Sequence, residues 1–296
     1  MREFAAYWRM DQIQLESGDY RGRIRGVHTG VIQLGLSEQS ISTRVDGSVP
    51  AGSVVVALRL PSPHATSFRG RRLESREMAI IRAGEEIASL HAGASRILTV
   101  AIAEPLADEI ARCHGCASFD AVFPGDRLAM ATPPAIATAG RRLLGLLDEV
   151  FKNAQPFATL AAAEDFERRI IKTLFSEAHH PPSGQLDSDG RKHARSAENH
   201  LRDHMRQPLD LLRLCRELGT TPRTLQSGFH NTFGLSMKSY SQALRFNGTR
   251  RDLIAADPAV DSVKAVALDW GFRHMGRFAT DYRKWFGECP GMTLAK

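Results

Sequence analysis

The sequence predicts a two-domain protein, in which a β-rich barrel with a pair of helices precedes an all-α domain of two helix-turn-helix units joined by a long helix. One short pattern occurs twice in the last hundred residues or so. The spacing of apolar residues changes from strand-like to helical at about residue 130, and a segment rich in Pro, Gly and Ser follows that change. A chain of 296 residues is long enough for two domains of ordinary size.

Short β-prone runs bounded by Gly, Pro, Ser or Asp predict strands in residues 20 to about 130. The clearest runs are residues 31–34, 53–58, 78–81 and 97–102. Strands this short, separated by turns, are typical of a small barrel or sandwich. The stretches 141–153 and 160–175 then place apolar side chains on one helical face. We expect these helices within residues 139–178, where they either pack on the barrel or pair with another subunit.

The clearest domain boundary is the segment 181–190, in which Leu186 is the one apolar residue. Its Pro, Gly, Ser and Asp residues favour a flexible linker. We therefore expect an N-terminal domain over residues 1–180, a linker over 181–192 and a C-terminal domain over 193–296.

A repeated pattern organises the C-terminal domain. Each copy has a small residue, a glycine four positions later, and then apolar residues about every four positions. The first copy contains Cys215, Gly219, Leu225, Phe229 and Phe233-Gly234, and the second contains Ala267, Gly271, Phe278, Tyr282 and Phe286-Gly287. A helix-turn-helix needs a small residue where its helices cross, glycine at a turn with positive φ, and an apolar stripe that holds the second helix. The opposite face of that helix is then free to enter a DNA groove.

Capping and helix-breaking residues set the helix boundaries in this domain. Thr221 is a predicted N-cap with Pro222 in the first turn, whereas Pro208 and Pro258 end helices. The predicted helices are 194–205, 211–218, 222–233, 240–255, 262–269 and 274–286. We call the second and third of these unit one, and the last two unit two.

Positive charge is concentrated in the same domain. Residues 191–296 hold 18 Lys and Arg against 10 Asp and Glu, whereas residues 1–190 hold 21 against 23. This asymmetry is typical of a polyanion-binding module joined to a near-neutral domain. The residues predicted to bind DNA lie on the outer side and flanks of the second helix of each unit: Arg223, Thr224, Gln226, Ser227 and His230 in unit one, and Arg273, His274, Met275, Gly276, Arg277, Thr280, Arg283 and Lys284 in unit two.

The side-chain chemistry divides these residues by role. Arg can pair bidentately with guanine and Gln with adenine, and the methyl groups of Thr and Met can contact the thymine methyl. Arg283, Lys284 and Arg250 are better placed for phosphate, which supplies affinity without sequence information.

Residues 195–296 resemble the DNA-binding domain of the AraC/XylS family of bacterial transcription regulators. The most specific stretch runs from Val266 to His274 and matches the family's Ala-x3-Gly-Phe pattern. It continues with the spaced aromatics Phe278 and Tyr282 and with Phe-Gly-x-x-Pro, which ends at Pro290. The resemblance implies seven helices, two units in successive major grooves on one face of DNA, and contact with RNA polymerase. Carried over by position, it implies base contacts from Arg223, Gln226, Ser227, Met275, Gly276, Arg277 and Thr280.

The sequence departs from the family pattern at a few positions. Cys215 stands where unit one usually has Ala, and we interpret it as a structural residue. Ser227 stands where Arg is common, and Gly228 follows it at a cost of about 1 kcal/mol in helix propensity. Gly276 is similarly weak in unit two. Unit one is therefore expected to hold DNA less firmly than unit two.

The N-terminal half resembles the cupin-like effector and dimerisation domain of many AraC/XylS regulators, which implies a small-molecule effector or a homodimer. Cupin enzymes bind metal with a close His pair, but His28, His64, His91 and His114 are isolated. The Cys113-His114-Gly115-Cys116 segment has no second Cys pair, so we expect no metal and no cofactor.

Four arginines lie on or beside predicted strands: Arg23, Arg25, Arg44 and Arg59. They could meet an anionic ligand, but we interpret them as surface arginines on an outward strand face.

Several function classes are excluded at this level. No apolar run is long enough for a membrane span, and the first residues lack the apolar core of a signal peptide. Four cysteines are too few for a disulfide scaffold in a chain of this length. No phosphate loop, carboxylate pair or serine-nucleophile elbow stands in a convincing context, so we expect no catalytic residues and no enzyme.

The sequence therefore predicts a cytoplasmic transcription regulator that binds double-stranded DNA and activates transcription in response to an effector. Two alternatives remain open. In one, the N-terminal domain only oligomerises. In the other, residues 1–180 form an enzyme with an accessory DNA-binding tail.

Overall fold

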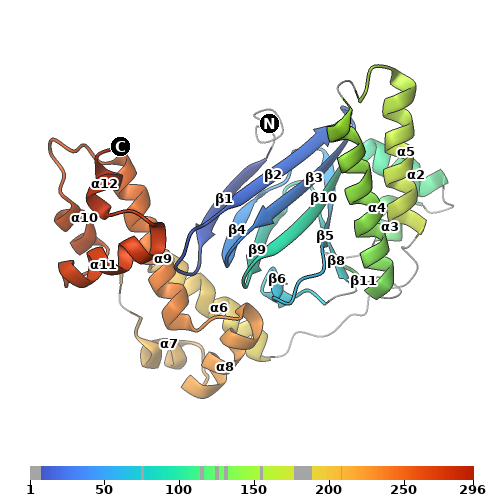
Figure 1. The fold of residues 1–296 in the computed structure, drawn as a ribbon. Helices are drawn as coiled ribbons and strands as arrows, with labels where there is room; N and C mark the ends of the chain where they lie inside the picture. Colours follow the sequence, from blue (N-terminus) through green and yellow to red (C-terminus); the bar gives the residue numbers. More distant parts are fainter. Residues whose placement is uncertain are drawn as a thin grey trace.

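The computed structural model describes residues 8–74, 77–113, 117–123, 127–129, 133–153, 156–176, 189–207 and 209–296. Two antiparallel sheets form the N-terminal half, a pair of helices follows them, and further helices form the C-terminal half (Figure 1). The predicted fold class is confirmed.

We call the two sheets sheet A and sheet B. Sheet A has the strand order β1 (Arg9–Gln14), β4 (Thr43–Ser48), β9 (Glu86–His91), β6 (Thr66–Phe68) and β7 (Arg71–Arg72). Sheet B has the order β11 (Arg127–Ala129), β8 (Glu77–Ile81), β5 (Ser53–Arg59), β10 (Ser95–Ala103), β3 (Ile32–Gln39) and β2 (Gly22–His28). All paired neighbours are antiparallel, and the central register places Val100 opposite both Leu34 and Val56.

The four predicted strands correspond to β3, β5, β8 and β10 of sheet B. These strands are apolar because both of their faces are covered. The remaining strands are richer in polar residues; β2, for example, reads Gly-Arg-Ile-Arg-Gly-Val-His and lies at a sheet edge. Helices α2 (Glu104–Cys113) and α3 (Phe119–Val122) lie within the region that was expected to be rich in strands.

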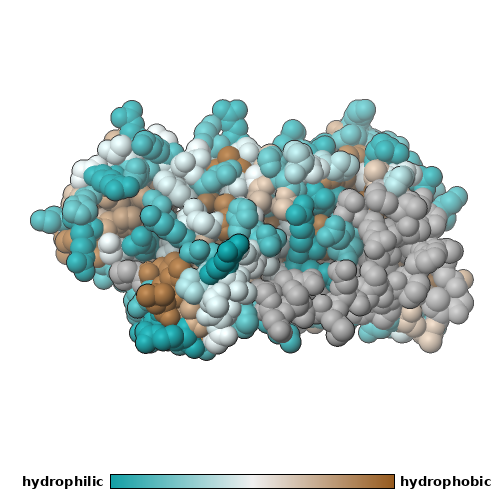
Figure 2. Space-filling model, turned by 90° about the horizontal axis from the view of Figure 1, so that it is seen from below, coloured by the Kyte–Doolittle hydropathy of each residue, from teal (hydrophilic) through white to brown (hydrophobic). Residues whose placement is uncertain are grey.

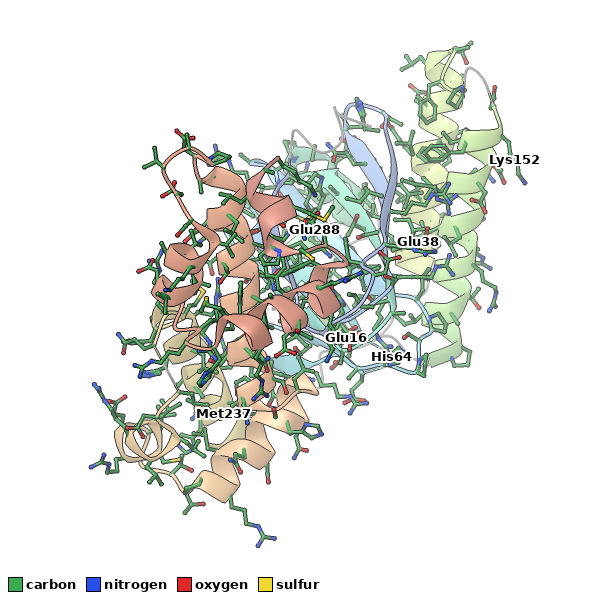
Figure 3. The ribbon with its side chains drawn as sticks, turned by 60° about the vertical axis from the view of Figure 1, so that its left-hand side comes forward. Glu16, Glu38, His64, Lys152, Met237 and Glu288 are labelled. Carbon is green, nitrogen blue, oxygen red and sulfur yellow. The ribbon has the colours of Figure 1, made fainter. Side chains whose placement is uncertain are left out.

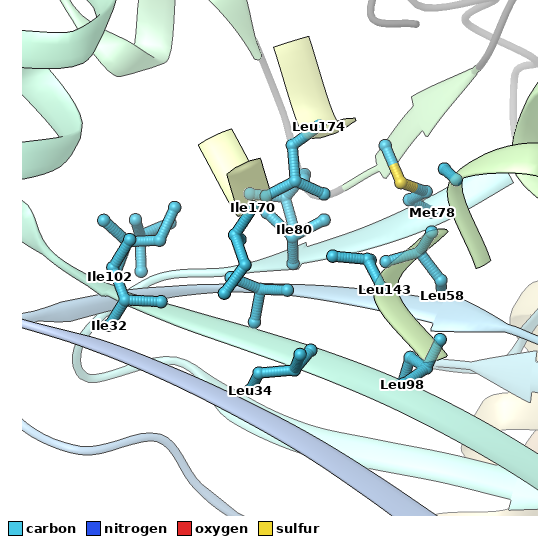
Figure 4. Packing of buried hydrophobic residues seen from close by; sticks show 14 of the residues in the cluster. Ile32, Leu34, Leu58, Met78, Ile80, Leu98, Ile102, Leu143, Ile170 and Leu174 are labelled. Atoms are coloured by element: carbon cyan, nitrogen blue, oxygen red, sulfur yellow. The ribbon is translucent and has the colours of Figure 1, made fainter. Parts of the chain in front are cut away.

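The outer face of sheet B is covered by α4 (Pro133–Lys152) and α5 (Leu160–Ser176). Leu143 of α4 and Ile170 and Leu174 of α5 pack over strand residues such as Leu58 and Leu98 (Figure 4). The predicted helix pair therefore packs within the chain, and α4 begins six residues earlier than expected.

The outer face of sheet A lies against the C-terminal domain instead. Leu15 and Leu90 belong to the same buried apolar cluster as Phe229 and Tyr240 of that domain. The C-terminal domain thus covers one side of the β-sandwich, and α4 and α5 cover the other.

The C-terminal domain consists of α6 (Asp189–Asp203), α7 (Leu211–Glu217), α8 (Pro222–Phe233), α9 (Met237–Ala255), α10 (Val263–Asp269), α11 (Met275–Phe286) and α12 (Pro290–Leu294). Helix α6 begins at Asp189, so residues 189–192, which were expected to belong to the linker, are helical. Residues 181–188 of that linker lie outside the described residues. Helix α6 ends at Asp203, before Pro208, which also lies outside them.

Candidate nucleic-acid interface

Unit one is formed by α7, a glycine turn and α8. Gly219 has a φ of 62°, a conformation that any side chain would strain. Thr221 then caps α8, because its hydroxyl accepts a hydrogen bond from the Thr224 backbone N–H at 3.2 Å, and Pro222 occupies the first turn. The predicted start and end of this helix are confirmed.

An apolar stripe holds α8 in place. Leu225, Phe229 and Phe233 are buried, and the ring of Phe229 lies 5.6 Å from that of Tyr240 on α9. Cys215 is buried on the facing side of α7, and burial raises the pKa of its thiol. A buried, protonated thiol fits the structural role predicted for this position.

Unit two repeats the arrangement with α10 and α11. Gly271 has a φ of 76°, and Phe278 and Tyr282 are buried on the inner face of α11. Phe286, which was expected to face the core, is only half-buried. Trp285 is buried instead, and its ring stacks on Phe246 of α9 at 5.3 Å.

Helix α9 joins the units, and unit two is packed tightly against it. A Cβ atom on Gly248 would lie 2.0 Å from the Trp270 ring, so this contact requires glycine. The Trp270 indole N–H donates to Asp252 at 2.7 Å, and Arg206 binds the same carboxylate at 3.1 Å. Figure 3 shows Met237 at the start of α9 and Glu288, just after α11, at the other end of the domain.

The structure places the predicted DNA-binding residues on α8, on α11 and on the residues just before α11. All are exposed except Met275, which is half-buried and packs on the core of the C-terminal domain. Figure 2 shows hydrophilic side chains on the face on which α7 and α8 lie, together with one compact hydrophobic patch. The exposed residues are Arg223, Thr224, Gln226, Ser227 and His230 on α8, and Arg273, His274, Gly276, Arg277, Thr280, Arg283 and Lys284 in unit two.

Arg277, Lys284 and Arg250 each lie near an acidic side chain. Arg277 is 83% exposed and lies 3.6 Å from Asp281, and Lys284 lies 3.9 Å from the same carboxylate. Such exposed pairs contribute little and can exchange for another anion. Arg250 was expected to be well placed for phosphate. Its guanidinium instead binds Glu288 at 3.1 Å and lies over the Phe286 ring.

A cavity of about 300 Å³ lies between the two sheets of the N-terminal half. Val55, Ala57 and Arg59 of β5 line it from sheet B, and Ile87, Ser89 and His91 of β9 line it from sheet A. Alternation along β5 sends Val54, Val56 and Leu58 to the opposite face, under α4 and α5.

The four strand arginines have different environments. Arg23 is exposed, as interpreted, and Arg25 is bound to Asp148 of α4 at 2.8 Å. The surface interpretation is wrong for Arg44, which is 3% exposed. It is wrong also for Arg59, which is half-buried and lines the cavity.

Arg44 belongs to a polar cluster between the domains that the sequence did not reveal. It binds Asp46 on its own strand with two hydrogen bonds of 2.7 Å, and it forms an ion pair with Glu198 of α6. Tyr240 of α9 donates to Glu198 at 3.0 Å, and Arg202 lies 3.3 Å from Asp46. Residues from β4, α6 and α9 meet here, and no spacing within the chain relates them.

Within the described ranges, no group of three or more His, Cys, Asp and Glu residues could hold a metal ion. His114 and Cys116 lie outside those ranges. No helix in the described part of the chain is long and apolar enough to cross a bilayer.

Two successive helix-turn-helix units with exposed polar second helices define a DNA-binding protein of the double helix-turn-helix class. A family model described as a helix-turn-helix domain matches residues 214–296. A probable thc operon regulatory protein of Rhodococcus erythropolis is 39% identical over 34% of this chain and 30% of its own length. XylDLEGF operon transcriptional activator 3 of Pseudomonas putida is 30% identical over 52% of this chain and 46% of its own length.

A solved structure of a probable AraC family transcriptional regulator from Rhodopseudomonas palustris is also similar. It is 30% identical to this chain over 35% of the chain and 95% of its own length, with a TM-score of 0.33. The C-terminal region is therefore a helix-turn-helix DNA-binding domain of the AraC/XylS type. The chain spans less than half the length of the two curated relatives named above.

Proposed function

We propose that this chain is a sequence-specific transcription activator that responds to a small-molecule effector. The observation that carries the proposal is the joining of two helix-turn-helix units by α9, each with its polar face exposed. The matched relatives are regulators or activators of operons. DNA binding of this kind needs no catalytic step.

The exposed residues would divide into base-reading and phosphate-binding groups. Arg223 and Gln226 on α8 and Arg277 and Thr280 on α11 present side chains that can discriminate base edges in the major groove. Lys284 lies one turn further along α11 and would bind phosphate. Ser227, a short side chain where arginine is common in the family, supports weaker reading of bases by unit one.

The N-terminal domain would supply the regulatory input. Its cavity is large enough for a small organic molecule. Phe151 and Leu160, on the helix pair, are 54% and 76% exposed and would contribute to a homodimer interface. We also propose that residues 1–180 form this effector domain and that the DNA-binding domain includes α6.

The DNA-bound protein would contact RNA polymerase, and it would do so in the cytoplasm.

Selection of the purified full-length protein against a random duplex DNA library tests the proposal. At about physiological salt we expect enrichment of two short motifs roughly 10–11 base pairs apart, because the units would enter successive major grooves. The selection should be repeated with residues 189–296, so that inhibition by the N-terminal domain cannot mask binding. No enrichment with either protein would overturn the proposal.

A second candidate function, in which the N-terminal domain only forms oligomers, is favoured by the exposed Phe151 and Leu160. Thermal unfolding in the presence of small-molecule libraries distinguishes the two. A ligand at 100 times its dissociation constant adds about 2.7 kcal/mol to the free energy of unfolding. A ligand that stabilises the protein favours the effector role. If a substitution that fills the cavity removes this stabilisation, the ligand binds in the cavity.

A further inference from the structure

The cavity between the sheets is mostly apolar but has one polar end. Val55, Ala57, Phe68, Ile81 and Ile87 form much of the apolar wall. Polar groups gather where β5, β6 and β9 meet: Arg59, Thr66 and His91. A molecule that fills this space would therefore need an apolar body and a polar group at one end.

Arg59 is the one formally charged side chain among the described residues that line the cavity. One terminal nitrogen, Nη1, donates to the backbone oxygens of Ser62 at 3.2 Å and His64 at 3.1 Å. These bonds fix the guanidinium and leave donors on its other nitrogens. Across the described part of the chain, Arg59 makes no ion pair with a carboxylate.

The Arg59 guanidinium is partly buried, and nearby acidic groups do not fully compensate for the water that it loses. Burial and then the nearby Arg72 charge lower the pKa of Arg59, and Glu74 opposes them only in part. A guanidinium in this position gains more from an anion than a fully hydrated one does, because the surrounding dielectric is lower.

His91 adds a neutral hydrogen-bonding group beside Arg59. Its ring Nδ1 lies 3.2 Å from the Thr66 hydroxyl. Burial, followed by the Arg59 charge, lowers the pKa of His91 to about 4, so the ring is neutral near pH 7. The positive charge at this end of the cavity is therefore that of Arg59 alone among the lining residues described.

We propose that the cavity binds a compact, largely apolar organic molecule that carries one anionic group, and that Arg59 pairs with that group. The inference rests on the proposed function in one respect, since it names the chemical class of the effector. It does not depend on which DNA sequence the protein reads.

Two fluorescent probes of nearly the same shape test the charge requirement. 1-Anilinonaphthalene-8-sulfonate carries a sulfonate, and N-phenyl-1-naphthylamine has the same rings without it. Both are titrated into the full-length protein. We expect the sulfonate to bind at least about tenfold more tightly, which corresponds to one charge-assisted contact of about 1.4 kcal/mol.

Substitution of Arg59 tests the residue. Arg59→Gln is expected to remove the tenfold preference and leave the dissociation constant of the neutral probe within about twofold. Arg59→Lys should retain part of the preference, because it keeps the charge but loses the planar fork. Arg23→Gln, on the exposed strand β2, is the matched control and should change neither constant. A preference that survives in Arg59→Gln would overturn the proposal.

The site of binding needs its own control. Ala57 lies on the cavity wall two residues before Arg59, so Ala57→Phe should fill the space and abolish binding of both probes. If that variant unfolds, Ala57→Leu, with a smaller side chain, should weaken both probes. Sulfonate binding that survives in folded variants would place it elsewhere and contradict the inference. The DNA selection above reads out the proposed function separately, so either can fail alone.

Discussion

At the scale of single residues, the side chains with the clearest predicted roles stand on α11. Arg277 and Lys284 are both exposed and both lie near Asp281, yet they sit at different depths along the helix. Arg277 stands in the first turn and Lys284 in the last turn of α11. We propose that Arg277 contacts base edges and that Lys284 contacts phosphate.

Replacing these two residues should therefore have different consequences for DNA recognition. Arg277→Ala is expected to cost about 1–3 kcal/mol of binding free energy and to relax preference at one base position. Lys284→Ala should weaken binding to all sequences about equally. It should also reduce the slope of the logarithm of the binding constant against the logarithm of the salt concentration by about one. Affinities for the selected site and its single-base variants, measured at several salt concentrations, check this. Identical effects of the two substitutions would refute the division of roles.

The stability of the folded protein should depend on pH through the buried side chain of His91. The folded state lowers the pKa of His91 from 6.5 to about 4, so between these values the unfolded chain binds one more proton than the folded protein. Stability should therefore rise with pH across this window and level off above about 6.5. The contribution is about 3 kcal/mol.

Chemical denaturation of the wild type and of His91→Gln, from pH 4 to 7, measures this contribution. The variant should lack the part of the pH dependence that belongs to His91, whereas the titration of carboxylates affects both proteins alike. Parallel stability curves for the two proteins would contradict the assignment.

At the scale of secondary-structure elements, helices were predicted more accurately than strands. The bounds of α8 were predicted correctly because Thr221, Pro222 and Gly234 mark them with local chemistry. Strands β1 and β4 carry polar residues and pair with each other although β2 and β3 lie between them in the chain, and a single sequence does not reveal such a pairing. Strand β2 is polar as well, although its partner β3 is the next strand in sequence. The exposed residues of α8 and α11 could be found for the same local reason. The Arg44 cluster could not, because three separate elements bring it together.

Packing between α9 and α10 depends on one glycine. Gly248→Ala should destabilise the protein by about 1–3 kcal/mol, because the added methyl group would collide with the Trp270 ring. Gly145→Ala in α4 is a suitable control. A Cβ at that position meets open space, so the better helix propensity of alanine should stabilise by about 0.5–1 kcal/mol. Denaturant titrations that show both substitutions shifting stability in the same direction would be inconsistent with this packing.

At the scale of the whole molecule, sheet A separates the cavity from the DNA-binding domain. Val45 of β4 lines the cavity, whereas its neighbour Arg44 points the other way, to Glu198 of α6. The two side chains lie on opposite faces of one strand. The domains are thus held together partly by a buried ion pair and partly by the apolar contacts of Leu15 and Leu90.

Breaking that ion pair should loosen the junction between the domains. Arg44→Met leaves Glu198 buried without its cation, at an expected cost of about 3–5 kcal/mol. Thermal unfolding should then show two separated transitions, one for each domain. Arg23→Met, on an exposed strand position, is the control and should unfold as the wild type does. An Arg44→Met variant as stable as this control would show that the pair does not hold the junction.

We propose that both units, held at a fixed separation by α9, read one face of DNA together. The most direct test measures the affinity of the full-length protein for the selected site and for the same site with five base pairs inserted between its two motifs. The insertion turns one motif by half a helical turn, so affinity should fall at least about tenfold, to that of a single motif. Equal affinity for the two sites would mean that the units do not bind together, and would contradict the account.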